Sequence, residues 1–456
     1  MVLSEILQRF VNERPVAVMV RAVLEKQFAD SFFDTTFEEV AEQQYTRELA
    51  LSTCAKVVTQ VTLGQTASVH AAFVKDRETI PVSIASLYEK LQHIEPRVCE
   101  ELVSRSAGPL TEVVTTLSRR DEPIPGYRLR IVDGNVLASS EHRLKELRGS
   151  SAAAMPGKSL VLYDYATDLI SDVVACEDGE ASERRLIPQL LTKVCEGDLI
   201  MADRNFCTVD METGLEQRGA KFLIRHHGSM SLAFEGEAMQ CGRCQTGEVH
   251  EQEARLKCGS VYRVVTIIRD KPLKDGGDKV VLLTDLPREK ATAQELANLY
   301  LRRWTIEEAF RQLTEYLSCE VRTLGYPKAA LFAFTLAVLA YNTMMCVKAA
   351  LKAAHPEDQE EWSTYYMAWE VKATFDGMLV AVLPQEWQPF AAMSNQSLAD
   401  FLRQMASNID RARYAKHRRG PKKTPERKKA RSRHKSTAKV LQERKLKRTP
   451  SPQSSP

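Results

Sequence analysis

Three acidic residues occupy positions from which carboxylates could do chemistry. Asp133 and Asp203 each follow a short apolar run, and Glu307 lies in LYLRRWTIEEAFRQL at residues 299–313. An acid at the end of an apolar strand projects where a sheet meets solvent, a common place for active sites in α/β proteins. Taken alone, each aspartate could also serve a turn or cap a helix. The three acids therefore have to be judged together.

The residues around Glu307 have the periodicity of an amphipathic helix. Its apolar stripe would contain Ile306, Phe310 and Leu313, and Glu308 would point to solvent. A second stripe beside the apolar one contains Tyr300, Arg303, Glu307 and Arg311. A simple ion pair on the surface of a core helix would explain the charges on this second stripe.

Converging carboxylates repel one another unless cations hold them. Oxygen-only ligands favour Mg²⁺, with Mn²⁺ possible. Two ions about 3.5–4 Å apart clamp the attacking and leaving oxygens of an in-line phosphoryl displacement, and guanidinium groups bind phosphate. We therefore predict Asp133, Asp203 and Glu307 as catalytic metal ligands for two Mg²⁺ ions, with Arg303 and Arg311 facing DNA phosphates.

The order of expected elements predicts a mixed α/β fold. Three strands, a helix, a strand, a helix and a strand follow a helical N-terminal part, and a β-rich stretch then separates them from the Glu307 helix. The expected regions are a helical DNA-binding one (1–120), a first core part (121–227), a β-rich insertion (228–287), a second core part with the Glu307 helix (288–350), a helical region (351–412) and a basic tail (413–456) that is disordered or only loosely helical without DNA.

Charge is unevenly placed along the 456 residues. The net charge is +3, but residues 411–448 hold 18 Lys and Arg against two acids, a local +16, so the rest carries 3 − 16 = −13. A basic tail on an acidic body suggests a polyanionic partner, most commonly nucleic acid. The alternative is a solvated tail without a single partner.

Other patterns bear on compartment and metal content. Ten cysteines without a regular framework favour a reducing compartment, and the N-terminus lacks a secretory pattern, so we expect a cytoplasmic protein. The uncharged stretch 329–347 is expected to be a buried helix and not a membrane span. Cys241, Cys244, His250 and Cys258 have near zinc-ligand composition, but their irregular spacing favours a hairpin with incidental cysteines.

Taken together, the motifs resemble the DDE transposases of the insertion-sequence four family. The resemblance rests on IVDG at 131–134, ADRNF at 202–206 and the Tyr-x2-Arg-x3-Glu spacing within 300–307, and it covers roughly residues 10–345. It implies an RNase H-like core interrupted by a β-rich insertion, and a prokaryotic, nucleoid-associated enzyme. It also implies a homodimer that brings the two terminal inverted repeats of an insertion sequence together, cuts them and joins them to target DNA.

The resemblance assigns DNA contacts and shows one departure. It implies that Tyr300, Arg303 and Arg311 position the scissile phosphate, and we add Arg204 and Trp304 as further DNA contacts. The family signature has a lysine seven residues after the glutamate, where this chain has Thr314. Arg311 or Arg322 could replace that lysine. Two rival functions remain open: a decayed transposase that only binds DNA, and a structure-selective nuclease on the same fold.

Overall fold

The computed structural model describes residues 4–43, 48–137, 154–257, 259–272, 277–357, 362–416 and 435–448. Its centre is a mixed sheet in which the first five long strands run in the order β4-β3-β1-β5-β6. β1 pairs with β3 and β3 with β4 in antiparallel fashion, whereas β1, β5 and β6 are parallel. This is the RNase H-like arrangement that the sequence predicts. The five strands are β1 (Arg128–Leu137), β3 (Gly157–Asp164), β4 (Ile170–Cys176), β5 (Asp198–Ala202) and β6 (Lys221–Arg225).

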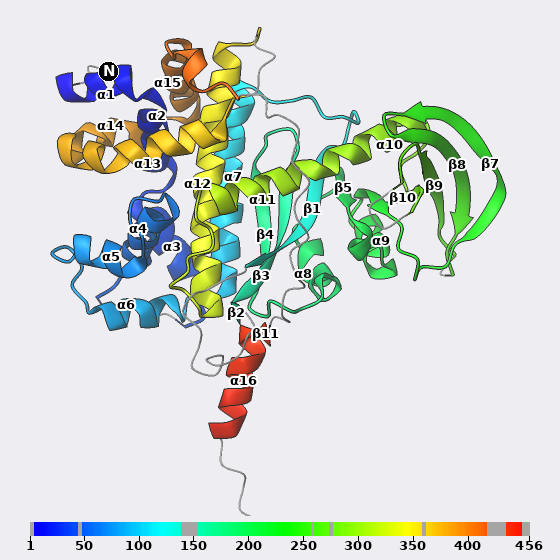
Figure 1. Ribbon diagram of the computed structural model, residues 1–456, viewed down its shortest axis with the longest axis horizontal. Helices are drawn as coiled ribbons and strands as arrows, with labels where there is room; N and C mark the ends of the chain where they lie inside the picture. Colours follow the sequence, from blue (N-terminus) through cyan, green and yellow to red (C-terminus); the bar gives the residue numbers. More distant parts are fainter. Residues whose placement is uncertain are drawn as a thin grey trace, which may run out of the picture.

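The β-rich stretch extends this same sheet. β10 pairs antiparallel with β6, and β9, β8 and β7 follow in order, so the sheet has nine strands. Figure 1 shows the added strands at the right, on the far side of the core strands from α7 and α12. The added strands are β7 (Ala233–Cys244), β8 (Gly247–Arg255), β9 (Val261–Arg269) and β10 (Lys279–Thr284).

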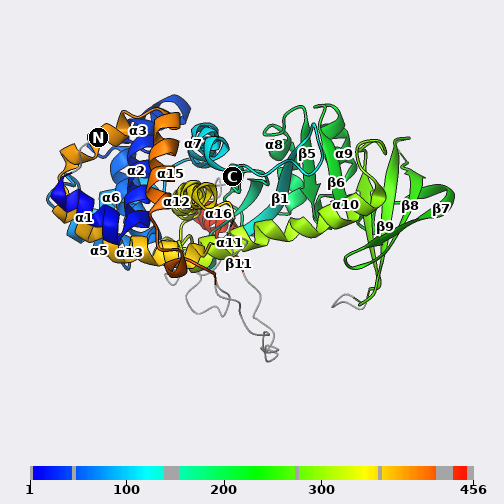
Figure 2. The same cartoon turned by 90° about the horizontal axis from the view of Figure 1, so that it is seen from above.

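The two faces of the core sheet bury different hydrophobic clusters, as the two-residue period of a strand requires. Ile131 and Met201 pack on the face covered by α11 (Thr305–Glu315) and α12 (Pro327–Ala354). Val132 and Ile200 pack on the opposite face against α8 (Ile187–Leu191) and α9 (Val209–Glu216). Figure 2 shows α11 and α8 on opposite sides of the sheet.

Helices from both ends of the chain pack around α12 in one hydrophobic core, although the sequence divides them into separate regions. The 18-residue apolar window of α12 is fully buried, as predicted, and α12 alone among the described helices is long and apolar enough to span a membrane. The surrounding helices are α1 (Glu5–Glu13), α2 (Pro15–Gln27), α3 (Asp30–Val40), α4 (Leu51–Thr62), α5 (Val69–Lys75), α6 (Ile84–Leu91), α7 (Pro96–Leu117), α13 (Thr364–Ala381), α14 (Gln388–Ala391) and α15 (Asn395–Ser407).

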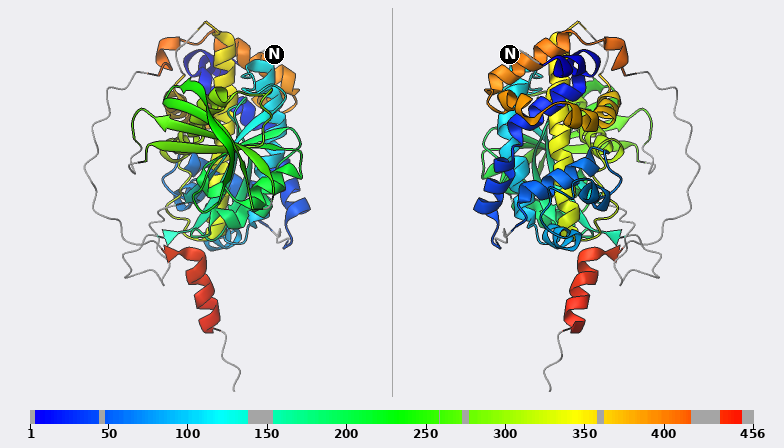
Figure 3. Two further views of the ribbon diagram at one scale, coloured as in Figure 1. Left: turned by 90° about the vertical axis from the view of Figure 1, so that its right-hand side faces the viewer. Right: turned by 90° about the vertical axis from the view of Figure 1, so that its left-hand side faces the viewer.

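Residues 435–448 form regular elements, in a tail that the sequence predicts to be disordered or only loosely helical without DNA. β11 (Lys435–Ser436) pairs with β2 (Ala154–Met155), and α16 (Thr437–Arg448) projects from the body (Figure 3). The Lys439 ammonium lies 3.0 Å from the Glu180 carboxylate, and Val440 is buried. The composition of the tail does not predict these elements, because the rest of the protein supplies the apolar and acidic groups that they contact.

Glu212 of α9 is a buried acid with little compensation. Its side chain is fully buried, its Oε2 has no hydrogen-bond partner within the described residues, and the Cys207 thiol lies 3.8 Å from its Oε1. Burial raises the pKa of Glu212 from 4.5 to about 8. The folded protein therefore binds this proton more tightly than the unfolded chain does.

Glu212→Gln should remove a loss of stability at high pH. Because the folded-state pKa is the higher one, the contribution of Glu212 to stability is fully present below pH 4.5 and is lost as the pH rises towards 8, by about 1.4 kcal/mol per unit. The variant should resist urea better than the parent at pH 8 and lose that advantage at pH 5. Asp210→Asn, an exposed control on the same helix, should keep the parent's dependence on pH. Urea midpoints whose difference is the same at both pH values would contradict this account.

Candidate active site

The pairing of β1 with β5 brings Asp133 and Asp203 side by side. The last parallel pair joins Val132 to Ala202, and each aspartate is the next residue on its strand. Neighbouring strands lie about 4.8 Å apart. The Asp203 side chain accepts a hydrogen bond from the Asn205 N–H at 2.8 Å and so caps the turn that follows. The two aspartates therefore project from adjacent positions at one edge of the parallel strands.

Asp133 does not end its strand, which corrects one detail of the prediction. β1 continues to Leu137, and Asp133 pairs with Val161 of β3. The strand continues because β3 is long enough to pair with it after the shorter β5 has ended. Asp133 therefore lies on a rigid two-stranded ladder and not on a mobile loop.

A single guanidinium joins two of the three predicted acids. Arg303 Nη1 lies 3.1 Å from Asp133 Oδ2, and Arg303 Nη2 lies 2.9 Å from Glu307 Oε1. The Arg303 side chain is only 12% exposed. Asp133 and Glu307, which are far apart in the sequence, thus share the Arg303 side chain, and Glu307 lies close to the strand that carries Asp133.

The pKa of Asp133 reflects the charged groups around it. Burial raises the pKa of Asp133, while the Arg303 guanidinium and the Gly134 N–H at 2.9 Å lower it. The nearby Asp203 and Glu183 carboxylates raise it again, to about 6 overall. Several negative groups therefore compete for one compensating charge.

The segment that carries Arg303 is not one continuous helix. α10 (Ala293–Tyr300) passes into a 3-10 turn, η4 (Leu301–Trp304), before α11 begins at Thr305. A 3-10 turn has about 3.0 residues per turn, so a single α-helical stripe cannot run through it. The Tyr300 hydroxyl is consequently buried and donates to the Ala202 carbonyl at 3.3 Å. It steadies the end of β5 in this structure and is turned away from solvent.

Arg311 and Glu308 also differ from the expected stripe. Arg311 Nε donates to Glu308 Oε2 at 2.8 Å, Arg311 pairs with Glu315 as well, and its Nη1 donates to the Tyr316 hydroxyl at 2.7 Å. Glu308 is therefore engaged in an ion pair and does not simply point to solvent. Arg311 has three partners of its own and makes no recorded contact with Glu307.

The remaining predicted DNA contacts lie at the surface. Trp304 is 62% exposed, and the Arg303 guanidinium lies 5.2 Å from the centre of its ring. Arg204 is exposed in η3 (Arg204–Phe206), directly after Asp203. Arg322 is exposed in the loop between α11 and α12, and Thr314 is exposed on α11.

Glu183 was missed by reasoning from sequence. Glu183 opens the 3-10 turn η2 (Glu183–Leu186), and its carboxylate accepts a hydrogen bond from Asn205 Nδ2 at 3.1 Å. The signal that could have found it is Gly134, a glycine inside a strand, which often marks a close approach.

The donor chemistry of the site suits a hard divalent cation, because all its candidate ligands are carboxylate oxygens. In the part of the chain that the structure describes, no three Asp, Glu, His or Cys side chains already stand as a ligand set for one ion. Arg303 lies between Asp133 and Glu307 and supplies the positive charge there. A cation bound by both acids would take over that role.

The zinc alternative gains no support. Cys241 and Cys244 lie on β7 as free thiols, and their sulfurs contact the Met239 carbonyl and the Thr246 hydroxyl. Cys258 lies outside the described residues.

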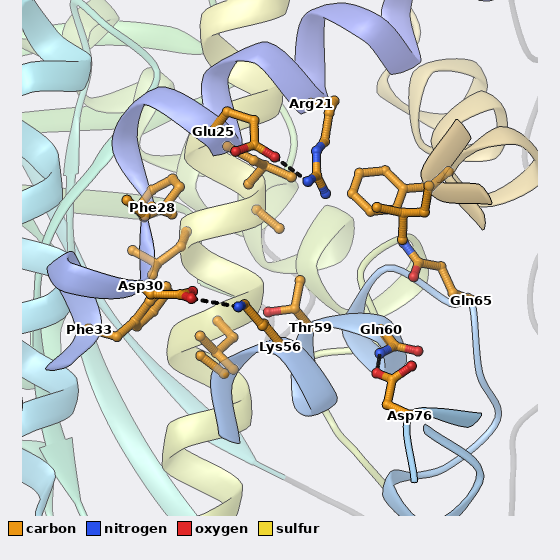
Figure 4. A pocket seen from close by; sticks show the side chains of 18 of the residues that line it. Arg21, Glu25, Phe28, Asp30, Phe33, Lys56, Thr59, Gln60, Gln65 and Asp76 are labelled. Carbon is orange, nitrogen blue, oxygen red and sulfur yellow. Dashed lines mark hydrogen bonds and ion pairs between the residues drawn. The ribbon is translucent and has the colours of Figure 1, made fainter. Parts of the chain in front are cut away.

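The large cavity among the helices is a separate feature. It has a volume of about 900 Å³ and is lined by residues of α2, α3, α4, α12 and α13. Figure 4 shows the charged groups at this cavity paired with one another, Arg21 with Glu25 and Lys56 with Asp30. None of the acids or arginines predicted from the sequence lines it.

Comparison with known proteins identifies the domain that holds the acid cluster. Residues 124–343 match the family described as the transposase DDE domain. The chain carries a transposase DDE domain. The matched range includes Asp133, Asp203 and Glu307, and proteins of this class act on DNA and generally use divalent metal ions. Membership of the insertion-sequence four family stays a prediction.

One solved structure that resembles the chain is the cryo-EM structure of a piggyBac transposase synaptic complex with hairpin DNA. It shares 9% sequence identity at a TM-score of 0.41, and the match covers 81% of this chain and 84% of that one. No curated protein matches the chain.

Removing the guanidinium should destabilise the metal-free DDE domain. Arg303→Ala leaves Asp133 and Glu307 without their shared cation, at a cost of about 1–2 kcal/mol, because the 39% exposed Glu307 is partly screened by water. Mg²⁺ should then raise the melting temperature of the variant more than that of the parent, since the ion replaces the lost charge. Differential scanning fluorimetry in EDTA and in Mg²⁺ measures both effects.

Arg302→Ala is the control for this comparison, because the Arg302 guanidinium lies over the Tyr165 ring at 5.2 Å. It should show the parent's response to Mg²⁺. An identical Mg²⁺ shift in Arg303→Ala and the parent would contradict the role given to the guanidinium.

Proposed function

We propose that the DDE domain cuts DNA at the ends of the insertion sequence that encodes it and joins the freed 3′ ends to target DNA. The observation that carries this proposal is the bridge from Asp133 through Arg303 to Glu307, beside an Asp203 that the β1–β5 register brings to the same edge. The acids come from three different elements, and this supports a site that cuts phosphodiesters.

In this proposal, Asp133, Asp203 and Glu307 hold two Mg²⁺ ions. The bound ions would lower the pKa of the attacking water and stabilise the leaving oxygen of an in-line displacement at phosphorus. The protein contributes a fixed frame for the ligands: Asp133 is held on the β1–β3 ladder, and Tyr300 anchors the carbonyl just before Asp203. Glu307, on a separate helix, closes the set.

Arg303 has a second role once cations neutralise the acids. Its guanidinium is then free to donate two hydrogen bonds to the scissile phosphate from a position beside both ligands. The neighbouring Trp304 ring, largely exposed, offers an apolar surface to a base or sugar at the cut. Arg204 and Arg322 would contact the DNA backbone farther out.

The reaction then has two displacements at phosphorus. In the first, the water oxygen bonds to phosphorus, the bond to the 3′ oxygen breaks, and that oxygen leaves as a 3′-hydroxyl. In the second, this hydroxyl attacks a target phosphate and displaces the target's own 3′ oxygen. A homodimer would hold the two inverted repeats together, in the cytoplasm where the nucleoid lies. The basic tail would add sequence-independent affinity for DNA.

A cleavage assay tests the proposal. The full-length protein is incubated with Mg²⁺ and duplexes that carry the DNA flanking its gene on either side. We expect nicks that leave a 3′-hydroxyl at the element ends, followed by products joined to a target plasmid. Asp133→Asn, Asp203→Asn and Glu307→Gln should each abolish nicking, whereas Glu308→Gln should keep most of it because Glu308 serves Arg311.

The outcomes separate the rival functions. Binding of the flanking DNA without nicking in Mg²⁺ or Mn²⁺ would indicate a protein that only binds DNA. Nicking without joined products would indicate a nuclease. Loss of activity in Glu308→Gln with retention in Glu307→Gln would show that the wrong glutamate has been assigned.

Thr314→Lys should strengthen binding to cleaved ends. Thr314 is exposed on α11 two turns after Glu307, and its hydroxyl lies 3.7 Å from the Cys319 sulfur. A charged contact to phosphate is worth about 1 kcal/mol more than a neutral one, which corresponds to about fivefold in affinity. Arg311 pairs with Glu308 and Glu315, so a contact from Arg311 to the phosphate would first require these ion pairs to break.

Fluorescence anisotropy with a pre-cleaved end measures this effect. Gln217→Lys, which adds the same charge at an exposed position of the segment after α9, is the control. Equal gains in both variants would show that only net charge matters.

A further inference from the structure

Glu183 reaches the acid cluster from the opposite layer of the fold. It belongs to η2, which leads into α8 on the face of the sheet away from α11. Its carboxylate lies against Gly134 of β1, and a Cβ built on Gly134 would be 2.2 Å from Glu183 Oε1 and 2.8 Å from Glu183 Cδ. The carboxylate thus occupies the space that any other residue at position 134 would fill.

Gly134 is a glycine for reasons of space. It lies within β1 and pairs with Leu160 of β3, and it does not have a positive φ. Backbone strain therefore gives no reason for glycine there, and a glycine inside a strand weakens the strand. What the missing side chain allows is the approach of Glu183 to the backbone directly after Asp133.

Asn205 ties Glu183 to the predicted ligands. Its side-chain Nδ2 donates to Glu183 Oε2 at 3.1 Å, and its backbone N–H donates to Asp203 Oδ1 at 2.8 Å. Arg184 Nε in turn donates to the Asn205 carbonyl at 3.0 Å. One residue therefore orients two carboxylates, while Glu183 Oε1 lies against Gly134, and the Glu183 charge is close enough to Asp133 to act on it.

We propose that Glu183 is a fourth carboxylate of the cation site, held by Asn205 and admitted by Gly134. This inference rests on the proposed function, because it assumes that Asp133, Asp203 and Glu307 bind divalent cations. A purely structural role would be to stabilise the start of η2 by an acid at its N-terminus. That role would not make metal affinity depend on Glu183.

Direct metal binding tests the proposal without DNA or turnover. Mn²⁺ is titrated into the full-length protein and the free ion is followed by electron paramagnetic resonance. Glu183→Gln should weaken Mn²⁺ binding by about tenfold or more, the range typical for residues that support a metal site. Its melting temperature in EDTA should stay close to that of the parent, since the amide still accepts the hydrogen bond from Asn205.

Glu180→Gln is the matched control. Glu180 lies three residues earlier on the same connection, but its carboxylate accepts from the Ser436 N–H and pairs with Lys439. It should bind Mn²⁺ as the parent does.

Gly134→Ala supplies an independent route to the same effect, because its methyl group displaces the Glu183 carboxylate. It should weaken Mn²⁺ binding about as much as Glu183→Gln, and the double variant should lose little more than either single one.

The Mn²⁺ titrations of these variants separate a failure of this inference from a failure of the proposed function. If Asp203→Asn weakens Mn²⁺ binding and Glu183→Gln binds within twofold of the parent, Glu183 is not part of the site and the proposed function stands. If the parent binds no Mn²⁺, or if Asp133→Asn and Asp203→Asn leave binding unchanged, both proposals fail. Additive losses in the Gly134→Ala, Glu183→Gln double variant would show that the two residues act separately, and would overturn the role given to Gly134.

Discussion

Mutual repulsion between carboxylates is the constraint on which this site depends. Asp133 lies near the negative charges of Asp203 and Glu183, and it shares the Arg303 guanidinium with Glu307. In a partly buried place such repulsion is costly unless a cation balances it. Arg303 provides that balance at a position where the proposed metal ions would later provide it. The arginine thus keeps the ligands assembled and marks where positive charge belongs.

The fold meets this constraint by bringing each acid from a different element. Parallel pairing fixes Asp133 beside Asp203, with no freedom of register once Val132 faces Ala202. The 3-10 turn η4 then turns Arg303 towards the strands while Tyr300, before it, holds the β5 end. A rigid sheet carries two of the proposed ligands and a helix packed on that sheet carries the third, so none of the three lies on a long loop.

Short-range periodicity and motif spacing were enough to predict the core strands, and the family resemblance implied the RNase H-like order that the sheet shows. The same spacing selects Asp133, Asp203 and Glu307, whose role as metal ligands stays a prediction. Local patterns do not reveal contacts that depend on distant segments. A stripe drawn through residues 300–311 assumes an unbroken α-helix, whereas the structure buries the Tyr300 hydroxyl against β5 and pairs Arg311 with Glu308. Their contacts with phosphate stay predictions. Glu183 lies in another layer, and only the packing against Gly134 reveals it.

The connection between β4 and η2 links the site to the basic tail. Glu183 at its end turns inward, whereas Asp178 and Glu180 bind Ser436, and Glu180 binds Lys439 of α16. β4 runs parallel to β1, since both are antiparallel to β3, so this connection lies at the edge towards which Asp133 points along the chain. A body with a net charge of −13 repels DNA at long range. Anchoring part of a +16 segment at that edge concentrates positive potential where the proposed reaction needs the phosphates, and leaves the carboxylates at the centre for cations.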